Sequence, residues 1–283
     1  MKTSDAVVAA RAAFRELHAS GCFVIPNPWD VGSAVYLRHL GFKALATTSA
    51  GFAFSRGLPD GQQGVPRDMA LGHFAEIVAA TDLPVNADFQ SGYGDDPEAV
   101  AESVRLCVET GVAGLSIEDA TGDEGRPLYE LPEAVARLKA ARAAIDASRS
   151  GVLLTARAEC YLVDHPEPLA ESIRRLRAYA EAGADVLYAP GPTERADIEA
   201  IVAAVAPKPV NVLVSDDIGL GVRDLAEMGA RRISVGGALA RAAWTGFMRA
   251  AKGIAEEGSF AGFKDLVTYG ELGRLFSPGR ASS

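Results

Sequence analysis

The 283-residue sequence contains few of the residues that ligate zinc or form disulfides. Its three cysteines, Cys22, Cys107 and Cys160, are scattered and show no CxxC spacing. Neither a disulfide framework nor a cysteine-ligated zinc site is therefore expected. The four histidines fall on predicted helices or late in a loop, which argues against a zinc site and against a histidine base at the end of a strand.

The chain also lacks an excess of positive charge and long apolar runs. It has 28 Lys and Arg against 37 Asp and Glu, a net charge of -9, so its field repels polyanions and no nucleic-acid partner is expected. No uncharged apolar stretch reaches the roughly 18 residues of a membrane-spanning helix. Residues 1–21 have the pattern of an amphipathic helix and lack the apolar core of a signal peptide. We therefore expect a cytoplasmic protein without a membrane partner.

The sequence does contain a repeated alternation of short apolar runs and segments of helical period. The expected strands are Cys22–Ile25, Ala44–Thr47, Pro84–Ala87, Gly114–Ile117, Leu153–Ala156, Val186–Tyr188, Val210–Leu213 and Arg232–Val235. The expected helices between and after them are Val31–His39, Asp68–Ala80, Pro97–Thr110, Leu131–Ala147, Pro168–Ala182, Thr193–Val205, Gly219–Met228 and Ala238–Glu257. Five of the eight strands follow a helix end that contains glycine, the residue that most easily terminates a helix.

Apolar strands joined by helical crossovers predict a parallel sheet that is covered on both faces. A single (β/α)8 TIM-type barrel over residues 1–283 satisfies this pattern, with an extra N-terminal helix and a short helical extension over residues 259–283. A doubly wound open sheet is the alternative. That fold usually has a Gly-rich phosphate turn after its first strand, whereas PNPWDVGS follows here, and no GxGxxG or GxxxxGK[ST] motif is present.

Charged side chains follow several of the expected strands, where parallel barrels place their catalytic groups. Asp88, Glu118 and Glu159 are carboxylates at or just after strand ends, and Arg157 lies among them. Acids that converge raise one another's pKa unless a cation neutralises them, and Mg²⁺ prefers such oxygen ligands. Because the planar fork of arginine pairs well with carboxylates, we expect an anionic substrate.

Longer motifs follow the expected strands along most of the chain. They are NPWDVGSA, TTSAGFAFSRGLPDG, NADFQSGYGDDPE, GLSIED, TARAECY, GADVLYAPG, KPVNVLV and MGARRISVGG. In combination they resemble the isocitrate lyase/phosphoenolpyruvate mutase superfamily. The resemblance implies an Mg²⁺-dependent barrel enzyme, with Mn²⁺ as an alternative ion, that acts on small 2-oxo or 2-hydroxy acids through a pyruvate-enolate-like intermediate. It also implies a homo-oligomer, either a dimer or a tetramer, in which a terminal helix is exchanged between subunits.

The same resemblance implies particular roles for residues of this chain. Ser49, with the backbone N–H groups of Ala50 and Gly51, is expected to hold the substrate carboxylate, and Arg157 to contact the same acid. The predicted catalytic residues are Ser49, Glu118 and Arg157. The further predicted substrate-binding residues are Trp29 and Asn211, and the residues predicted around the metal are Asp60, Asp88, Gln90 and Glu118.

Two departures from the superfamily pattern refine the functional hypothesis. Gln90 stands where a second acid usually follows Asp88, which removes a negative charge and should weaken Mg²⁺ binding. The loop after the fourth strand is EDATGDEGRPLYEL and lacks the cysteine of the KKCGH-like motif of isocitrate and methylisocitrate lyases. The leading hypothesis is a carbon–carbon lyase or decarboxylase. The alternatives are a phosphoenolpyruvate or carboxyphosphonoenolpyruvate mutase and a non-catalytic acid-binding barrel.

Overall fold

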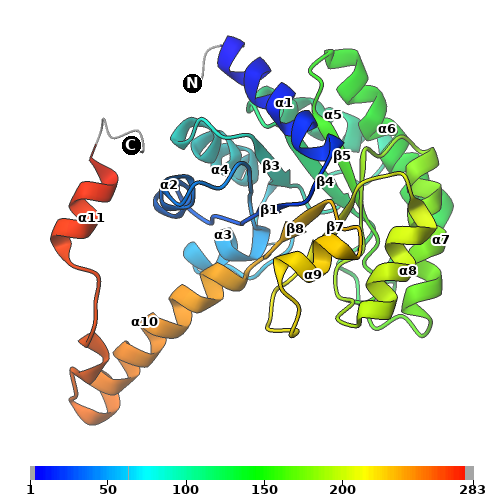
Figure 1. Ribbon diagram of the computed structural model, residues 1–283. Coiled ribbons are helices and arrows are strands. Elements are labelled where there is room, and N and C mark those ends of the chain that lie inside the picture. The colour runs from blue at the N-terminus through cyan, green and yellow to red at the C-terminus, as the bar shows by residue number, and fades with distance from the viewer. Residues whose placement is uncertain (1–3, 63, 278–283) are drawn as a thin grey trace.

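The computed structural model describes residues 4–62 and 64–277, and within them eight parallel strands form one sheet (Figure 1). The strands are β1 Phe23–Ile25, β2 Leu45–Ala46, β3 Val85–Asp88, β4 Gly114–Glu118, β5 Leu153–Arg157, β6 Val186–Tyr188, β7 Val210–Leu213 and β8 Arg232–Ser234. They are hydrogen-bonded in the order β1-β8-β7-β6-β5-β4-β3-β2. At the remaining seam the Ala46 N–H donates to the Pro26 carbonyl at 3.1 Å. The predicted barrel is therefore confirmed, and the open-sheet alternative is wrong.

Helices surround this sheet and connect successive strands (Figure 1). They are α2 Val31–His39, α3 Ser49–Ser55, α4 Arg67–Ala80, α5 Pro97–Glu109, α6 Leu131–Ser148, α7 Pro168–Glu181, α8 Arg195–Val205 and α9 Val222–Glu227. The predicted strands agree with the observed ones to one residue at each end. The short helix α3 was not expected, because its sequence SAGFAFS is too short to show a helical period.

Helix α1, Ser4–Ala19, covers the amino-terminal end of the barrel. Its Phe14 is fully buried and packs in one cluster with Ile25 and Leu153, which lie on strands β1 and β5. Arg11 extends from the same helix and donates to the carbonyls of Val108 and Val112 at 2.8 and 2.9 Å. The extra N-terminal helix therefore closes one end of the barrel, and the opposite end stays accessible.

The carboxyl-terminal segment leaves the barrel (Figure 1). It consists of α10 Ala238–Glu257, the 3-10 turn Ala261–Phe263 and α11 Tyr269–Phe276. Ala240 is the one residue of α10 that is buried, although the helix carries several large apolar side chains. The last residues of the predicted extension, 278–283, and residues 1–3 of the predicted domain lie outside the described residues. In the part of the chain that is described, no helix is both long and apolar enough to cross a membrane.

Asn27 joins the strands on the two sides of the seam. Its side-chain carbonyl accepts the N–H groups of Val235 and Gly236, both at 2.9 Å, and its amide donates to the Thr47 carbonyl at 2.9 Å. Asn27 itself is buried, with 5% of its surface exposed. One side chain thus satisfies three backbone groups that follow β2 and β8.

We expect Asn27→Ala to lower the free energy of unfolding by about 3 kcal/mol, because a buried backbone group left without a partner costs on the order of 1 kcal/mol or more. Urea unfolding followed by circular dichroism measures this. Asn86→Ala is the matched control, since the Asn86 side-chain oxygen is buried without a hydrogen-bond partner. Its amide donates to the Ala87 carbonyl, which also accepts from the Ser116 hydroxyl, so its loss should cost less than about 1 kcal/mol. Equal losses for the two variants would refute the role of Asn27 at the seam.

Candidate active site

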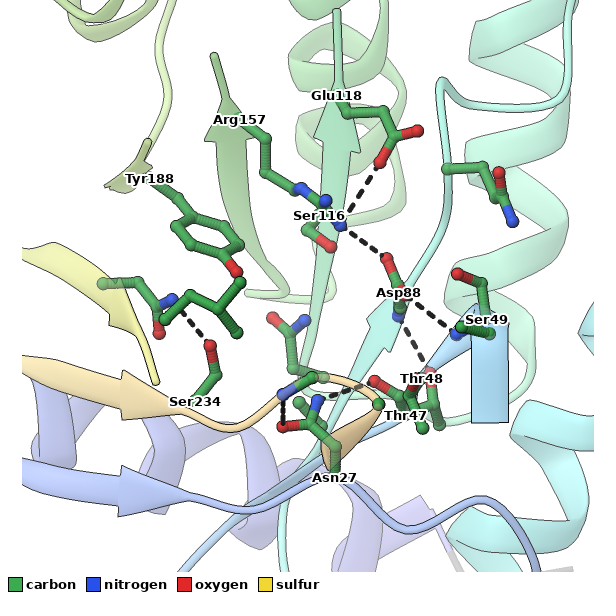
Figure 2. A pocket seen from close by; sticks show the side chains of 18 of the residues that line it. Asn27, Thr47, Thr48, Ser49, Asp88, Ser116, Glu118, Arg157, Tyr188 and Ser234 are labelled. Atoms are coloured by element: carbon green, nitrogen blue, oxygen red, sulfur yellow. Dashed lines mark hydrogen bonds and ion pairs between the residues drawn. The ribbon is translucent and has the colours of Figure 1, made fainter. Parts of the chain in front are cut away.

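A cavity of about 270 Å³ opens at the carboxyl ends of the strands (Figure 2). Its wall contains polar side chains from every strand or from the segment that follows it. Those that matter below are Asn27, Thr47, Ser49, Asp60, Asn86, Asp88, Gln90, Ser116, Glu118, Arg157, Glu159, Tyr188, Asn211, Arg232 and Ser234. In TIM-type barrels this end of the sheet carries the active site.

Arg157, at the end of β5, pairs with three carboxylates at once. Its Nη1 lies 2.9 Å from Asp88 Oδ1 and 3.2 Å from Glu118 Oε2, and its Nε lies 2.8 Å from Glu159 Oε1. All four side chains are at most 17% exposed. The strand register produces this cluster, because Glu118 of β4 is the direct partner of Arg157 in the parallel ladder.

Asp88 is oriented from three directions. The Ser49 N–H donates to its Oδ2 at 2.9 Å, while Arg157 occupies its Oδ1. Its own backbone N–H donates to the Thr47 hydroxyl at 2.9 Å. The carboxylate at the end of β3 is therefore fixed against the first turn of α3 (Figure 2).

The acids outnumber the cations on this side of the cavity. Burial raises the pKa of Asp60 above its ordinary value, and the charge of Asp88 adds to that shift. Burial likewise raises the pKa of Glu118; Arg157 opposes the shift, and the neighbouring acids add to it. Burial also raises the pKa of Glu159, although Arg157 opposes the shift. One guanidinium does not balance three largely buried carboxyl groups with the more exposed Asp60 beside them, so the site favours protonation or the binding of an additional cation.

Asp119 supports this cluster from outside the cavity. Its Oδ1 accepts the Glu159 N–H at 2.8 Å, and its Oδ2 accepts from Arg175 at 3.0 Å and from the Tyr179 hydroxyl. Asp119 therefore serves hydrogen bonds between the segments that follow β4 and β5. This buried network fixes the backbone that carries Arg157 and Glu159.

Most of the predicted site residues lie around this one cavity. The lining includes Ser49, Ala50, Asp60, Asp88, Gln90, Glu118, Arg157 and Asn211. Trp29 and Gly51, which were predicted to contact substrate, do not line it. The Gly51 N–H instead donates to the Thr48 hydroxyl that caps α3, at 3.2 Å. A Cβ at Gly51 would lie 2.6 Å from Thr48 Cγ2 and 2.9 Å from Trp29 Cβ, so both residues serve the close packing of α3.

Several polar lining residues were not expected from the sequence, among them Asn86, Ser116, Tyr188 and Arg232. Alternation along a strand contained the signal for three of them, because side chains two residues apart point to the same face. Asn86, Ser116 and Arg232 each lie two residues before a polar strand-end residue. Polar residues inside a short barrel strand therefore indicate the interior wall as well as its rim.

A TIM-type barrel with an acid-rich cavity at the carboxyl ends of its strands has the architecture of an α/β-barrel enzyme. Comparison of the sequence with family models gives a match over residues 14–255 to the family described as phosphoenolpyruvate phosphomutase. The chain belongs to this family, within the isocitrate lyase/phosphoenolpyruvate mutase superfamily.

Two sequence relatives are informative. An uncharacterised Mycobacterium tuberculosis protein is 33% identical over 226 residues, which cover 79% of this chain and 81% of that protein. Oxaloacetate decarboxylase of Paraburkholderia xenovorans is 30% identical over 201 residues, which cover 67% of this chain and 63% of the decarboxylase.

Two solved structures resemble the fold over nearly its whole length. One, from Burkholderia cenocepacia J2315, is described provisionally as a lyase/mutase; it is 47% identical with a TM-score of 0.92, covering 97% of this chain and 98% of the other. The other is oxaloacetate acetylhydrolase in complex with its product oxalate, 28% identical with a TM-score of 0.83, covering 95% and 94% of the two chains. The named relatives include a decarboxylase and an acetylhydrolase, and the matching family is described as a phosphomutase, so this chain belongs to a family of enzymes.

The raised pKa of Glu118 predicts that the metal-free protein loses stability as pH rises above the ordinary value of 4.5. In that range the folded protein still holds a proton that the unfolded chain has released, so further deprotonation favours unfolding. We expect Glu118→Gln to melt at least about 2 °C higher than the unmodified protein at pH 8 in EDTA, with little difference near pH 4.5.

Glu124→Gln, in an exposed loop, serves as the control and should leave the melting curve unchanged at both pH values. A Glu118→Gln protein that melts lower than the unmodified protein at pH 8 would show that Glu118 is a stabilising, ionised partner of Arg157.

Proposed function

We propose that this protein is an Mg²⁺-dependent carbon–carbon lyase or decarboxylase that acts on a small 2-oxo or 2-hydroxy (di)carboxylic acid through a pyruvate-enolate-like intermediate. The observation that carries the proposal is the excess of buried carboxyl groups around Arg157 at the mouth of the barrel. Such a site favours the binding of a cation, and the bound cation in turn favours the binding of an anionic ligand beside it. A cavity of about 270 Å³ suits a small acid.

The donor set suits Mg²⁺ held largely through water. Asp60, Asp88, Glu118 and Gln90 present oxygen atoms, and the Gln90 amide reaches Asp60 Oδ1 at 3.4 Å. Among the described residues, no three acidic, histidine or cysteine side chains are close enough together to hold an ion by themselves. Mg²⁺ commonly binds through one or two carboxylates and several waters. When bound, the ion would act as a Lewis acid that stabilises negative charge on a substrate oxygen, and Mn²⁺ is an alternative.

The remaining groups of the site would bind and orient the substrate. Once Asp88 and Glu118 face a cation, the charge of Arg157 is available to a substrate carboxylate, with which it forms a bidentate pair well. Ser49 and Ala50 at the start of α3 lie beside that position. The names of the relatives, oxaloacetate decarboxylase and oxaloacetate acetylhydrolase, support an acid of this class.

A mutase is the second candidate, and the observation that favours it is the family model itself, which is described as phosphoenolpyruvate phosphomutase. Phosphorus NMR separates the two reactions, because a mutase alone creates a carbon–phosphorus bond. The third hypothesis, a non-catalytic acid-binding barrel, rests on Gln90, which lowers the negative charge at the proposed metal site, and is disfavoured because the named relatives are enzymes. Such a barrel would show tight binding of an acid without turnover.

The test is pyruvate release from a panel of C4 to C7 2-oxo and 2-hydroxy diacids, measured with Mg²⁺ and again with EDTA. We expect at least one acid to be cleaved in a metal-dependent way, and Asp88→Ala to lower that rate at least about 100-fold. Asp82→Ala, an exposed pair with Arg38 at 3.8 Å, is the matched control and should retain the rate. Inactivity of the unmodified protein across the panel would refute the proposal.

We also propose that the protein is a cytoplasmic homo-oligomer, a dimer or tetramer. The supporting observation is the apolar surface of α10, where Trp244, Phe247 and Met248 are 37%, 61% and 62% exposed. Phe260 and Phe263, in the segment that follows, are 66% and 49% exposed. Exposed apolar surface of this extent commonly marks a protein interface.

Phe247→Asp should shift the protein to a smaller species in light scattering, because a carboxylate buried in an apolar interface is costly. Val222→Asp places the same charge on a comparably exposed apolar residue of α9 and should leave the mass unchanged. A monomeric unmodified protein, or an unaltered mass for Phe247→Asp, would contradict this assignment of the interface.

A further inference from the structure

The two halves of the cavity wall differ in chemistry. All four lining carboxyl groups, Asp60, Asp88, Glu118 and Glu159, come from the half between β2 and β5. The half formed by β6, β7 and β8 contributes Tyr188, Asn211, Leu213, Arg232 and Ser234. A metal ion bound by these acids would therefore face a wall of neutral hydrogen-bonding side chains. Of the described residues that form that wall, Arg232 is the one with a positive charge, and it is buried.

Arg232 is the start of a hydrogen-bond chain on that second wall. It is 3% exposed, and its Nε donates to Asn211 Oδ1 at 2.7 Å and its Nη2 to Thr155 Oγ1 at 3.2 Å. Its Nη1 lies 3.5 Å from His18 Nε2. None of these partners is a carboxylate. A guanidinium has donors and no acceptor. Arg232 therefore determines which atom donates and which accepts in the hydrogen bonds of Asn211 and Ser234.

The donor and acceptor roles along this wall can be assigned in order from Arg232 towards Tyr188. Since Asn211 Oδ1 accepts from Arg232, the Asn211 Nδ2 must be the atom that donates to Ser234 Oγ, at 2.9 Å. The Ser234 hydroxyl hydrogen is then free for the Tyr188 oxygen, and the nearby Ser234 side chain opposes the rise in the Tyr188 pKa that burial causes. The hydroxyl hydrogen of Tyr188 is thereby left for the cavity, toward which its oxygen points (Figure 2).

We propose that Tyr188 is the proton donor of this active site. The inference rests on the proposed function and adds a catalytic residue to it. In the decarboxylation of a 2-oxo diacid, the bond between C3 and the departing carboxylate breaks, CO2 leaves, and the electron pair forms the enolate. The Tyr188 hydroxyl gives its proton to C3, which becomes the methyl or alkyl carbon of the 2-oxo acid product. The tyrosinate then takes a proton from water.

The surroundings of Tyr188 suit a transient negative charge. The Arg157 guanidinium carbon lies 5.1 Å from the centre of its ring, and the Ser234 hydroxyl, which accepts from Asn211, has its hydrogen free for a negative charge on the Tyr188 oxygen. Burial keeps the resting hydroxyl protonated, with a pKa raised to about 12. Tyr188 can give up a proton, and it lies on the wall opposite the carboxylates that pair with Arg157.

The first arm of the test measures binding and does not depend on turnover. Oxalate is a planar dianion whose second carboxylate stands where C3 of the enolate would lie. Calorimetry with Mg²⁺ present should show that Tyr188→Phe binds oxalate about 3- to 10-fold more weakly, the effect of losing one hydrogen-bond donor. The control is Tyr161→Phe, whose hydroxyl donates to Asp197 at 2.9 Å and does not line the cavity.

The second arm follows the proton itself. A 3-methyl-substituted diacid decarboxylated in D2O by the unmodified protein should give a product with one deuterium at C3 in a single configuration. Tyr188→Phe should turn over about 100-fold more slowly or worse, with KM changed far less, and give both configurations, because the enolate is then protonated by solvent. Tyr161→Phe should behave as the unmodified protein.

The outcomes separate the two proposals. Equal oxalate affinity of Tyr188→Phe and the unmodified protein, or a single product configuration from Tyr188→Phe, overturns the role of Tyr188 and leaves the lyase proposal standing. Weaker oxalate binding by Tyr188→Phe, together with no turnover of any acid by the unmodified protein, refutes the lyase proposal and the proton transfer with it, and leaves Tyr188 as a hydrogen-bond donor to a bound anion. An unmodified protein that does not bind oxalate contradicts both.

Discussion

The central interaction of this molecule is the shared ion pairing of Arg157 with Asp88, Glu118 and Glu159. Three carboxylates, with Asp60 nearby, face one guanidinium in a buried place. Desolvation and mutual repulsion raise the pKa of several of these acids, so the arrangement is costly as long as no further cation joins it. That cost is the physical reason to regard the mouth of the barrel as a binding site for a cation together with an acid.

The barrel supplies the rigidity that such a cluster needs. Parallel pairing places Glu118 beside Arg157, and the buried Asp119, Arg175 and Tyr179 hold the backbone just beyond β5. Asn27 joins the two edges of the sheet at the opposite side of the cavity. The acids all lie on the half of the cavity wall between β2 and β5. On the other half, Arg232 donates to Asn211, which donates to Ser234 beside Tyr188.

The alternation of apolar runs and helical segments was sufficient to predict the eight strands and their order in a barrel. Strand-end polarity was sufficient to predict Asp88, Glu118, Glu159 and Arg157, because the carboxyl ends of parallel strands meet at one end of a barrel. Asp60, in a loop beyond α3, was expected only from the superfamily resemblance. Contacts within the cavity could not be predicted. The sequence does not reveal that the Gly51 N–H caps α3 through Thr48, or that Trp29 packs outside the cavity. Nor does the sequence reveal the orientation of the Asn211 side-chain amide, because that orientation depends on Arg232 of another strand, which donates to its oxygen.

The measurement that tests the account most directly is the number of protons released when Mg²⁺ binds. Calorimetric titration at pH 7 in two buffers of different ionisation enthalpy gives this number. If buried acids around Arg157 are kept protonated until a cation arrives, binding of Mg²⁺ must displace their protons, and we expect about one proton or more per ion. Binding without proton release, or no binding of Mg²⁺ at all, would contradict the account.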